Sequence, residues 1–600
     1  MPKKERYPCR FRARRATVGE GRYNRSVRGV RAPTLRVALS IFEFIVARKL
    51  FQLFCMNSRS LGHRAPVLWL VLPLIAGLST GRAGEWFAAS WLLMGASSAA
   101  VAAIFLTQRD TRLFGPAVCL AMFLAGMASY ALNRPRIAAW DLLPPREARL
   151  ALRIERVFVQ DDSRKTAGLA TVTRAEQPLE ELLGQRIYFS LTLPRGERAP
   201  IRSSVVATIG VIASLARDPP GNTFDGYLAN AGINFRFTRG RILGEEVQPS
   251  AYYGFCAEQA DRFAEILGVG VKHKRPELVG VLHAMLLGQQ HELSDEQIAI
   301  FRQSGTMHVF SISGLHIAVI AVGLHTLLSL IRLPAWMRYV TGLIALWLYV
   351  DITGAAPSAV RAFVMVAVVE TALVFQLPRN PLSALAASAL LILIFAPLQL
   401  FSASFQMSYG IVAALLLLGL PLADTWQKRL ALFEDLPKVT WGWHRHALDA
   451  LWRATLAAAA IGTAASLVSA VTGVLFFELF TPGALLANLW LIPACSAVLY
   501  MGMLSLLSGL VGFVGGSALA NHAAVLLLWL IEAGIRISVE LPATWFSATF
   551  KYPWLGAATL GALLVALVTG YAANWRGWNR GYWAPFAVVS LALIFGVTFT

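Results

Sequence analysis

Apolar runs of about 20 residues recur along this 600-residue chain and constrain its fold more than any other feature. A helix of about 20 apolar residues crosses the roughly 30 Å hydrocarbon core of a bilayer, where only helices and closed barrels satisfy their backbone groups. Charged residues make up 15% of the chain, whereas soluble domains contain about 25%. The sequence therefore predicts a mainly α-helical, polytopic membrane protein with about 11–13 transmembrane helices.

The order of apolar and polar segments predicts five regions. A basic N-terminal segment precedes three transmembrane helices, a soluble insert, a large helical domain and a final group of transmembrane helices. The insert has the composition of an ordinary soluble domain, so we expect it to lie outside the bilayer. The expected bounds of the five regions are 1–64, 65–133, 134–275, 276–531 and 532–600.

Positive charge is concentrated at the start of the chain. Residues 1–55 hold 14 of the 54 Lys and Arg residues but only three acidic ones, within a net charge of +20. Anionic lipid and nucleic acid both attract such a segment, and the positive-inside rule places it, with Arg109 and Arg112, in the cytoplasm. Three crossings then place the insert outside. Residues 37–54 fit an amphipathic surface helix, and a native start at Met56 is the alternative that excludes them.

The soluble insert alternates short apolar segments with turn-forming ones. Polar residues alternate with apolar ones in these segments, which are separated by DDSRK, LLGQ and PRGERAP. This pattern predicts a small antiparallel β domain, either a barrel or a sandwich. The expected strands lie within 149–160, 168–177, 185–194 and 203–215, with a fifth within 233–242.

Polar side chains inside apolar runs are the strongest pointers to function, because each is costly in a bilayer unless it faces partners or water. The first group is His308, Ser311, Ser313 and His316, and Ser-Gly at 313–314 is where we expect the helix to break. On one continuous helix, the two histidines would be about 80° apart. The group predicts a polar lumen, and the alternative is hydrogen bonding between helices.

Two further polar groups lie downstream. Asp351 ends one predicted span, Arg361 begins the next, and Glu370 lies deeper on the opposite face from Arg361. An ion pair between Asp351 and Arg361 across the intervening turn is the structural alternative to a functional role. In the third group, Gln406 and Ser408 open another span, where the neighbouring tyrosine could equally be an interfacial anchor.

Three motifs in this order resemble the ComEC family of competence proteins. They are FRQSGTMHVFSISGLHIAVIA, GAAPSAVRAFVM and FSASFQMSYG, and NTFDGYLANAGI at 222–233 resembles the segment that closes the family's external domain. The resemblance covers roughly residues 60–530. It implies an external OB-type barrel and a competence-type channel domain over 276–531.

The resemblance also implies a function. The expected role is an inner-membrane channel that conducts single-stranded DNA into the cytoplasm during natural transformation. The path would be lined by His308, Ser311, Ser313, His316, Asp351, Arg361, Glu370, Gln406 and Ser408. Stacking aromatics beside cations suit single strands, and the external DNA-binding candidates are Phe224, Tyr227, Phe235, Arg236, Phe237, Arg239 and Arg241.

Expected partners are single-stranded DNA, membrane lipid, an external DNA receptor and a separate cytoplasmic ATPase or DNA-coating protein, and a homo-oligomer is compatible with the sequence. The chain has no GxxxxGK[ST] loop, so the motor must be another protein. Many family members carry a metallo-β-lactamase-like domain with an HxHxDH zinc motif, which is absent here. The chain is therefore expected to be a nuclease-less member or a truncated gene product. We predict no catalytic residue, metal site or cofactor.

Two other classes of function remain open from the sequence. A membrane-embedded hydrolase or metalloenzyme would use His308, His316 and Glu370 for a metal, or Ser311 or Ser313 as nucleophile with His316 as base. Neither HExxH nor GxSxG is present, however. The other class is an exporter of another polymer or of a lipid built on the same scaffold.

Overall fold

The computed structural model describes most of the chain after the basic N-terminal segment. The predictions made for residues 1–64, and those made for Ser311, lie outside the described residues. The description covers 66–599 except 85–86, 110, 135–136, 138–139, 141–142, 161–164, 178, 195–198, 217–218, 222, 311, 378–379, 434–440 and 576–580.

In the described part of the chain, three helices precede the barrel, as expected: α3 (Leu68–Ala83), α4 (Ala89–Arg109) and α5 (Thr111–Asn133). Glycines let α3 and α5 approach closely, because a Cβ on Gly77 would lie 2.0 Å from the carbonyl oxygen of Phe123. A Cβ on Gly126 would likewise lie 2.5 Å from the oxygen of Leu74. Close packing through small residues is the usual way for membrane helices to associate.

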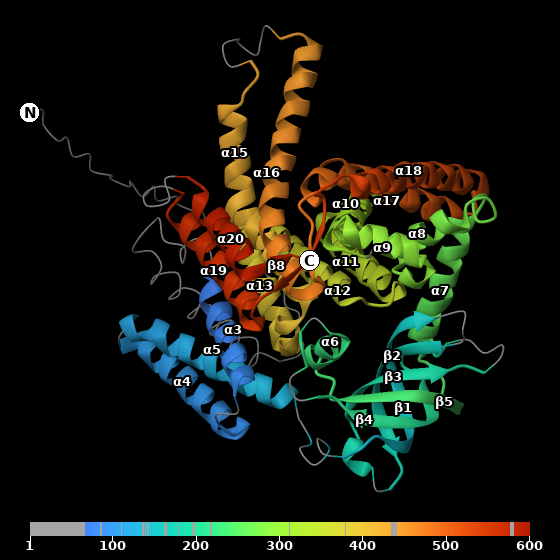
Figure 1. The fold of residues 1–600 in the computed structure, drawn as a ribbon, viewed down its shortest axis with the longest axis vertical. Coiled ribbons are helices and arrows are strands. Elements are labelled where there is room, and N and C mark those ends of the chain that lie inside the picture. Colours follow the sequence, from blue (N-terminus) through green and yellow to red (C-terminus); the bar gives the residue numbers. More distant parts are fainter. Residues whose placement is uncertain are drawn as a thin grey trace, which may run out of the picture. The chain divides into compact units, whose positions relative to one another are not determined.

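The soluble insert forms a closed five-stranded barrel, which confirms the predicted strands and the OB-type architecture (Figure 1). The strand order is β1-β2-β3-β5-β4. Neighbours are antiparallel except β3 and β5, which are parallel. An odd number of strands cannot close with alternating directions throughout, so one parallel pair is required. The strands are β1 (Arg146–Gln160), β2 (Lys165–Ala175), β3 (Arg186–Thr192), β4 (Val205–Ser214) and β5 (Phe235–Val247), and α6 (Phe224–Asn230) precedes β5.

Three helices connect the barrel to the rest of the helical domain: α7 (Ala251–Gly268), α8 (Pro276–Leu287) and α9 (Asp295–Gln303). All residues of α8 from Leu278 to Leu287 are buried, in a core shared with the two long helices α17 (Ala484–Leu510) and α18 (Val514–Glu540). The core includes a polar bridge, because buried His283 contacts Glu292 at 2.7 Å and the Ala264 carbonyl at 3.1 Å.

The remaining helices follow the predicted spans closely. Nine helices in the described part of the chain are long and apolar enough to cross a membrane, so this is a multi-pass membrane protein. Proline occupies the first turn of several helices of this domain, where its missing N–H costs no hydrogen bond. The remaining helices are α10 (Gly314–Leu330), α11 (Ala335–Ile352), α12 (Pro357–Val374), α13 (Pro381–Phe395), α14 (Ala403–Ala414), α15 (Leu420–Arg429), α16 (Trp443–Phe477), α19 (Pro553–Ala572) and α20 (Trp583–Gly596).

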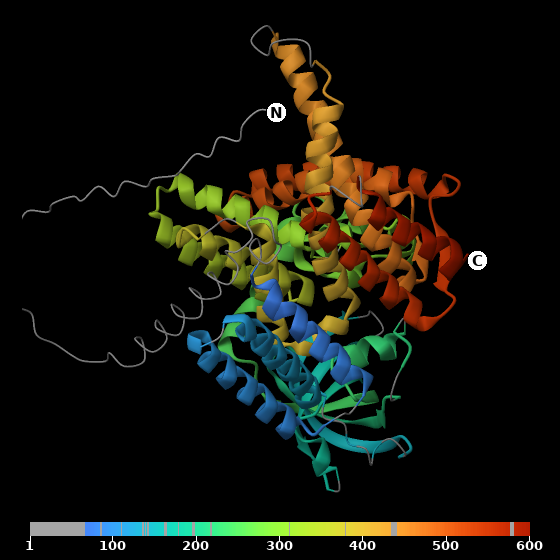
Figure 2. The same cartoon turned by 90° about the vertical axis from the view of Figure 1, so that its left-hand side faces the viewer.

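Two local features differ from a simple set of spans. Residues 424–429 end α15 and residues 443–453 begin α16, and the two helices run side by side in Figures 1 and 2. The indole of Trp452 donates to the Leu430 carbonyl at 2.8 Å and fixes this pairing. The second feature is a small three-stranded sheet of β6 (Leu479–Phe480), β7 (Phe546–Phe550) and β8 (Val597–Phe599).

Candidate functional site

The first polar motif surrounds a break before α10, as the Ser-Gly pair predicted. A 3₁₀ turn (Met307–Val309) precedes the break, and Ser313 is the N-cap of α10. The Ser313 backbone N–H donates to Nδ1 of His316 at 3.2 Å, and the Ser313 Oγ lies 2.7 Å from the same atom. Because Nδ1 accepts, His316 is the neutral tautomer with its proton on Nε2. That Nε2 is buried and has no hydrogen-bond partner among the described residues.

His308 lies outside α10, so the expected 80° separation on one helix is wrong. Its Nδ1 contacts the Gly305 carbonyl at 3.1 Å, and the side chain is exposed. Gly305 has φ +70°, and a Cβ there would lie 2.7 Å from Oγ1 of Thr481. The turn that presents His308 therefore requires glycine.

The second motif contributes a buried arginine from α12. Arg361 is 1% exposed, and its hydrogen-bond partners among the described residues are all neutral oxygens. Nη1 donates to Oε1 of Gln399 at 3.3 Å. Nη2 donates to the carbonyl (2.9 Å) and hydroxyl (2.5 Å) of Ser404 and to Oγ of Ser408 (3.1 Å). A guanidinium stays charged even when it is buried. Among the described residues, its charge is thus solvated by dipoles and not cancelled by a carboxylate.

The three motifs form one cluster. Ser358, in the first turn of α12, donates to the carbonyl of Ile312 at 2.7 Å and joins the second motif to the first. Arg361 joins the second to the third through Ser404 and Ser408. Gln406 has a different partner, since its Nε2 donates to the Leu400 carbonyl at 3.1 Å. We call Ser313, His316, Ser358, Arg361, Ser404 and Ser408 the motif cluster.

Comparison with known proteins identifies the domain that carries this cluster. Residues 285–572 match the family model described as Competence protein. The chain therefore contains a domain of the ComEC-like competence proteins. It is 30% identical to ComE operon protein 3 of Bacillus subtilis (strain 168) over 142 residues, which are 24% of this chain and 18% of that relative. It is 29% identical to Competence protein ComA of Neisseria gonorrhoeae over 332 residues, 52% and 40% of the two chains.

These matches are partial. The ComEC-like chain spans less than half the length of each of the two curated relatives. No solved structure matches it.

Asp351 lies apart from Arg361, and the ion pair considered between them is not formed. Its carboxylate instead accepts from Nη1 of Arg202, in the loop before β4, at 3.0 Å and from the hydroxyl of Tyr252 in α7 at 2.7 Å. Burial, together with the hydrogen bond and negative charge of Asp351, raises the pKa of the Tyr252 phenol. In this ComEC-like protein Asp351 therefore connects the barrel to the α11–α12 turn.

Glu370 lies in a separate small cleft between α10, α11 and α12. The cleft also contains His325 and Arg338, and its volume of about 20 Å³ is enough for one water molecule. Neither His308 nor His316 lines it. Within the described ranges, no three His, Cys, Asp or Glu side chains gather where they could hold a metal ion.

An aromatic and arginine patch covers part of the barrel surface. Phe224 and Tyr227 of α6 are 45% and 40% exposed and stack with ring centroids 5.9 Å apart. Tyr188 of β3 meets Phe224 edge-on at 5.1 Å, and the guanidinium of Arg236 lies 5.7 Å from the Phe224 centroid. Phe158 adds a fourth ring, 6.3 Å from Tyr227. We call Phe158, Tyr188, Phe224, Tyr227 and Arg236 the aromatic patch.

Two of the expected DNA-binding residues are wrong, because Phe235 and Phe237 are 1% and 0% exposed in the barrel core. Side chains alternate between the two faces of a strand, so placing Arg236 outside places both neighbours inside. Arg239 and Arg241 are exposed further along β5. Sequence reasoning missed Tyr188 and Phe158, whose proximity to α6 depends on the barrel closure.

Proposed function

We propose that this ComEC-like protein takes up DNA in competence and conducts a single strand through the inner membrane into the cytoplasm. The observation that supports this most directly is Arg361, a buried cation bonded only to neutral oxygens among the described residues. A DNA strand carries one charge per phosphate and cannot enter hydrocarbon without donors that replace its hydration. The motif cluster supplies such donors beside a positive centre.

The balance of charge in the motif cluster suits transit better than tight binding. One arginine attracts the phosphates, while the hydroxyls of Ser313, Ser404 and Ser408 and the neutral His316 add weak donors. Several unpaired cations at one depth would hold a polyanion too strongly for it to leave. The motif cluster would therefore attract the DNA strand and still allow it to leave.

The barrel is proposed as the external receiving domain. The aromatic patch offers rings for base stacking, worth about 1–3 kcal/mol per base, beside the guanidinium of Arg236. Arg236 is paired with Asp225 at 2.8 Å, and the exposed Arg239 and Arg241 add further positive charge along β5. The contact of Arg202 with Asp351 would hold this face near the start of α12.

The proposed function also requires partner proteins that deliver the DNA and drive its passage. An external receptor would deliver the DNA, and a cytoplasmic ATPase or DNA-coating protein would drive it, since the sequence has no P-loop. Self-association of the chain is a further proposal.

The test is uptake of labelled DNA in a deletion strain complemented with Arg361→Ala. We expect uptake to fall by at least about tenfold, because hydrogen bonds to charged groups contribute about 1.5–3 kcal/mol each. Arg302→Ala is the matched control, an exposed arginine of α9 bonded to the Phe477 carbonyl. Membrane abundance of each variant is measured by immunoblot. Normal uptake by an abundant Arg361→Ala variant would contradict the proposal.

A further inference from the structure

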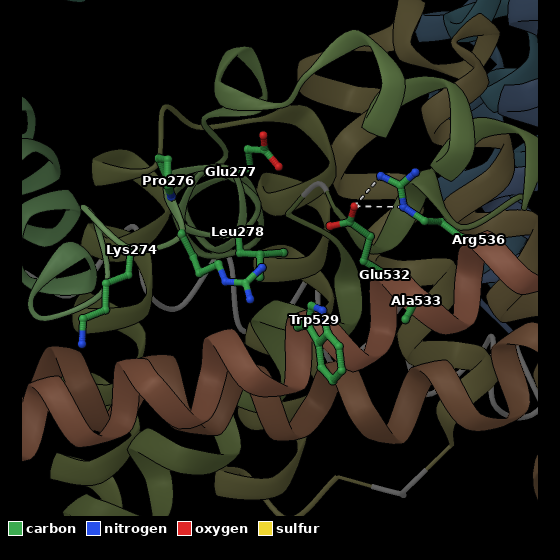
Figure 3. A pocket seen from close by; sticks show the side chains of 9 residues that line it. Lys274, Pro276, Glu277, Leu278, Trp529, Glu532, Ala533 and Arg536 are labelled. Carbon is green, nitrogen blue, oxygen red and sulfur yellow. Dashed lines mark hydrogen bonds and ion pairs between the residues drawn. The ribbon is translucent and has the colours of Figure 1, made fainter.

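A cavity of about 410 Å³ opens between the α7–α8 connection and α18, away from the motif cluster (Figure 3). One wall is the segment Lys274–Leu278, and the other is the part of α18 that bears Trp529, Glu532, Ala533 and Arg536. Neither the motifs nor the aromatic patch contributes to it. The cavity therefore needs its own explanation.

The charges that line the cavity are of both signs, but only some are available to a ligand. Arg536 is already held by Glu532 at 2.8 Å, a pair that Figure 3 shows, and by Glu296 at 2.6 Å. Lys274 and Arg275 are exposed and have no ion pair with a described residue. The same holds for Glu277, in the first turn of α8. The cavity thus presents two unpaired cations close in sequence to one unpaired carboxylate.

Beside Glu532 and Arg536, the α18 wall carries exposed apolar side chains that continue along a candidate span. Trp529 is 48% exposed, and Leu526, Leu530 and Ile537 are exposed on the same side of the helix. Their spacing of four and seven residues places them on one face. In a membrane-spanning helix, an exposed apolar strip faces lipid chains, and an exposed Trp lies at the level of the headgroups. The cavity therefore is lined by charged residues and borders an apolar strip of α18 that faces lipid chains.

We propose that this cavity binds a membrane phospholipid with a phosphoethanolamine headgroup. Lys274 and Arg275 would hold the phosphate, and the acyl chains would follow Leu526 and Leu530 along α18. The primary ammonium would donate to Glu277 and lie against Trp529, since an ammonium has three N–H donors and is attracted to an indole face. A purely anionic headgroup would leave Glu277 unpaired, and a quaternary ammonium could not donate to it.

The test is native mass spectrometry of the full chain in detergent, titrated with defined lipids. We expect phosphatidylethanolamine to bind at least about tenfold more tightly than phosphatidylglycerol or phosphatidylcholine of the same chain length. The double variant Lys274→Ala/Arg275→Ala should lose that binding. Glu277→Gln should reduce the preference for phosphatidylethanolamine over phosphatidylcholine and leave the affinity for phosphatidylglycerol unchanged or higher.

Lys272→Ala is the matched control, because Lys272 belongs to the same exposed basic run but does not line the cavity. It should bind lipid like the unmodified chain. Equal affinity for all three lipids, stronger binding of phosphatidylglycerol, or equal losses in Lys272→Ala and the double variant would each overturn the proposal. Circular dichroism verifies that each variant keeps its helical content.

Discussion

Arg202 of the barrel donates from Nη1 to Oδ1 of Asp351 at 3.0 Å, across 149 positions of sequence. The Asp351 side chain is nearly inaccessible, whereas Arg202 is partly exposed. Tyr252 completes the contact at 2.7 Å, and Oγ of Ser203 accepts from the backbone N–H of Ser250 at 3.0 Å. The Asp351 carboxylate at the end of α11 thus binds both the loop before β4 and the start of α7.

Charge reversal tests this junction. Arg202→Asp leaves the buried Asp351 carboxylate without its cation and beside a like charge, which destabilises the fold. We expect a lower thermal midpoint and reduced DNA uptake. The double variant Arg202→Asp/Asp351→Arg should recover part of both losses. Identical behaviour of the single and double variants would show that the pair itself does not join the two parts.

The aromatic patch predicts a specific loss of single-strand affinity. Replacing both Phe224 and Tyr227 with Leu removes two stacking rings, each worth about 1–3 kcal/mol. Fluorescence anisotropy of a labelled oligonucleotide with the purified full chain should show weaker binding by at least about tenfold. Leu243→Ala, an exposed apolar residue of β5, is the control. Unchanged affinity in the double variant would remove the patch from the proposed path.

Truncating a buried phenylalanine of β5 should lower the stability of the fold, since these rings lie in the barrel core and not on the DNA-binding surface. Phe235→Ala should destabilise the chain by about 3–5 kcal/mol, the usual cost of truncating a core aromatic. Its ring also packs edge-on against Trp140 at 5.4 Å. The measurement is thermal unfolding of the purified protein followed by circular dichroism. A stable variant with impaired DNA binding would return Phe235 to the binding surface.

Glu155 predicts a pH dependence of barrel stability. Burial alone would raise its pKa, but the hydrogen bond and charge of Arg186 and the hydrogen bond of Thr171 outweigh it and lower the pKa. A carboxyl with a lowered folded-state pKa stabilises the fold above its unfolded value of about 4.3. That contribution disappears as the pH falls through the folded pKa.

Thermal unfolding measured from about pH 3 to about pH 6 checks this expectation, because the range brackets the pKa of a Glu carboxyl in an unfolded chain. The unmodified chain should lose stability below about pH 4.3, and Glu155→Gln should be less stable at pH 6 and flatter in its pH response. Parallel curves for the two proteins would contradict the role of Glu155.

The N-cap of α10 gives a smaller effect. Ser313→Ala removes the hydroxyl contact to His316 but keeps the backbone N–H that also bonds Nδ1. Loss of an N-cap hydroxyl costs about 1 kcal/mol. We expect a modest fall in thermal stability with most DNA uptake retained. Uptake identical to that of the unmodified chain would show that the Ser313 hydroxyl is not one of the donors to the strand.

Local patterns predicted much of this molecule. Alternating polarity located all five barrel strands, and apolar runs located the helices of the membrane domain. The break at Ser313 followed from the Ser-Gly pair. Each of these features depends on residues that are close in sequence, so the amino-acid sequence alone is enough to predict it.

Contacts distant in sequence were not predictable. Nothing near Asp351 indicates Arg202 as its partner, and the alternative with Arg361 was closer in sequence but wrong. Glu370 was grouped with the motif residues by depth alone, whereas helix packing places it beside His325 and Arg338. Phe235 and Phe237 were misassigned because an aromatic beside an arginine fits both a stacking surface and the inward face of a strand.

The contact between Arg202 of the barrel and Asp351 has a kinetic consequence for the proposed function. A strand held on the barrel would be tethered close to the motif cluster, so threading would become an intramolecular step. Its rate would then depend on the geometry of the tether and not on the amount of DNA outside the cell. Weakening the Arg202 contact would make uptake depend more steeply on DNA dose.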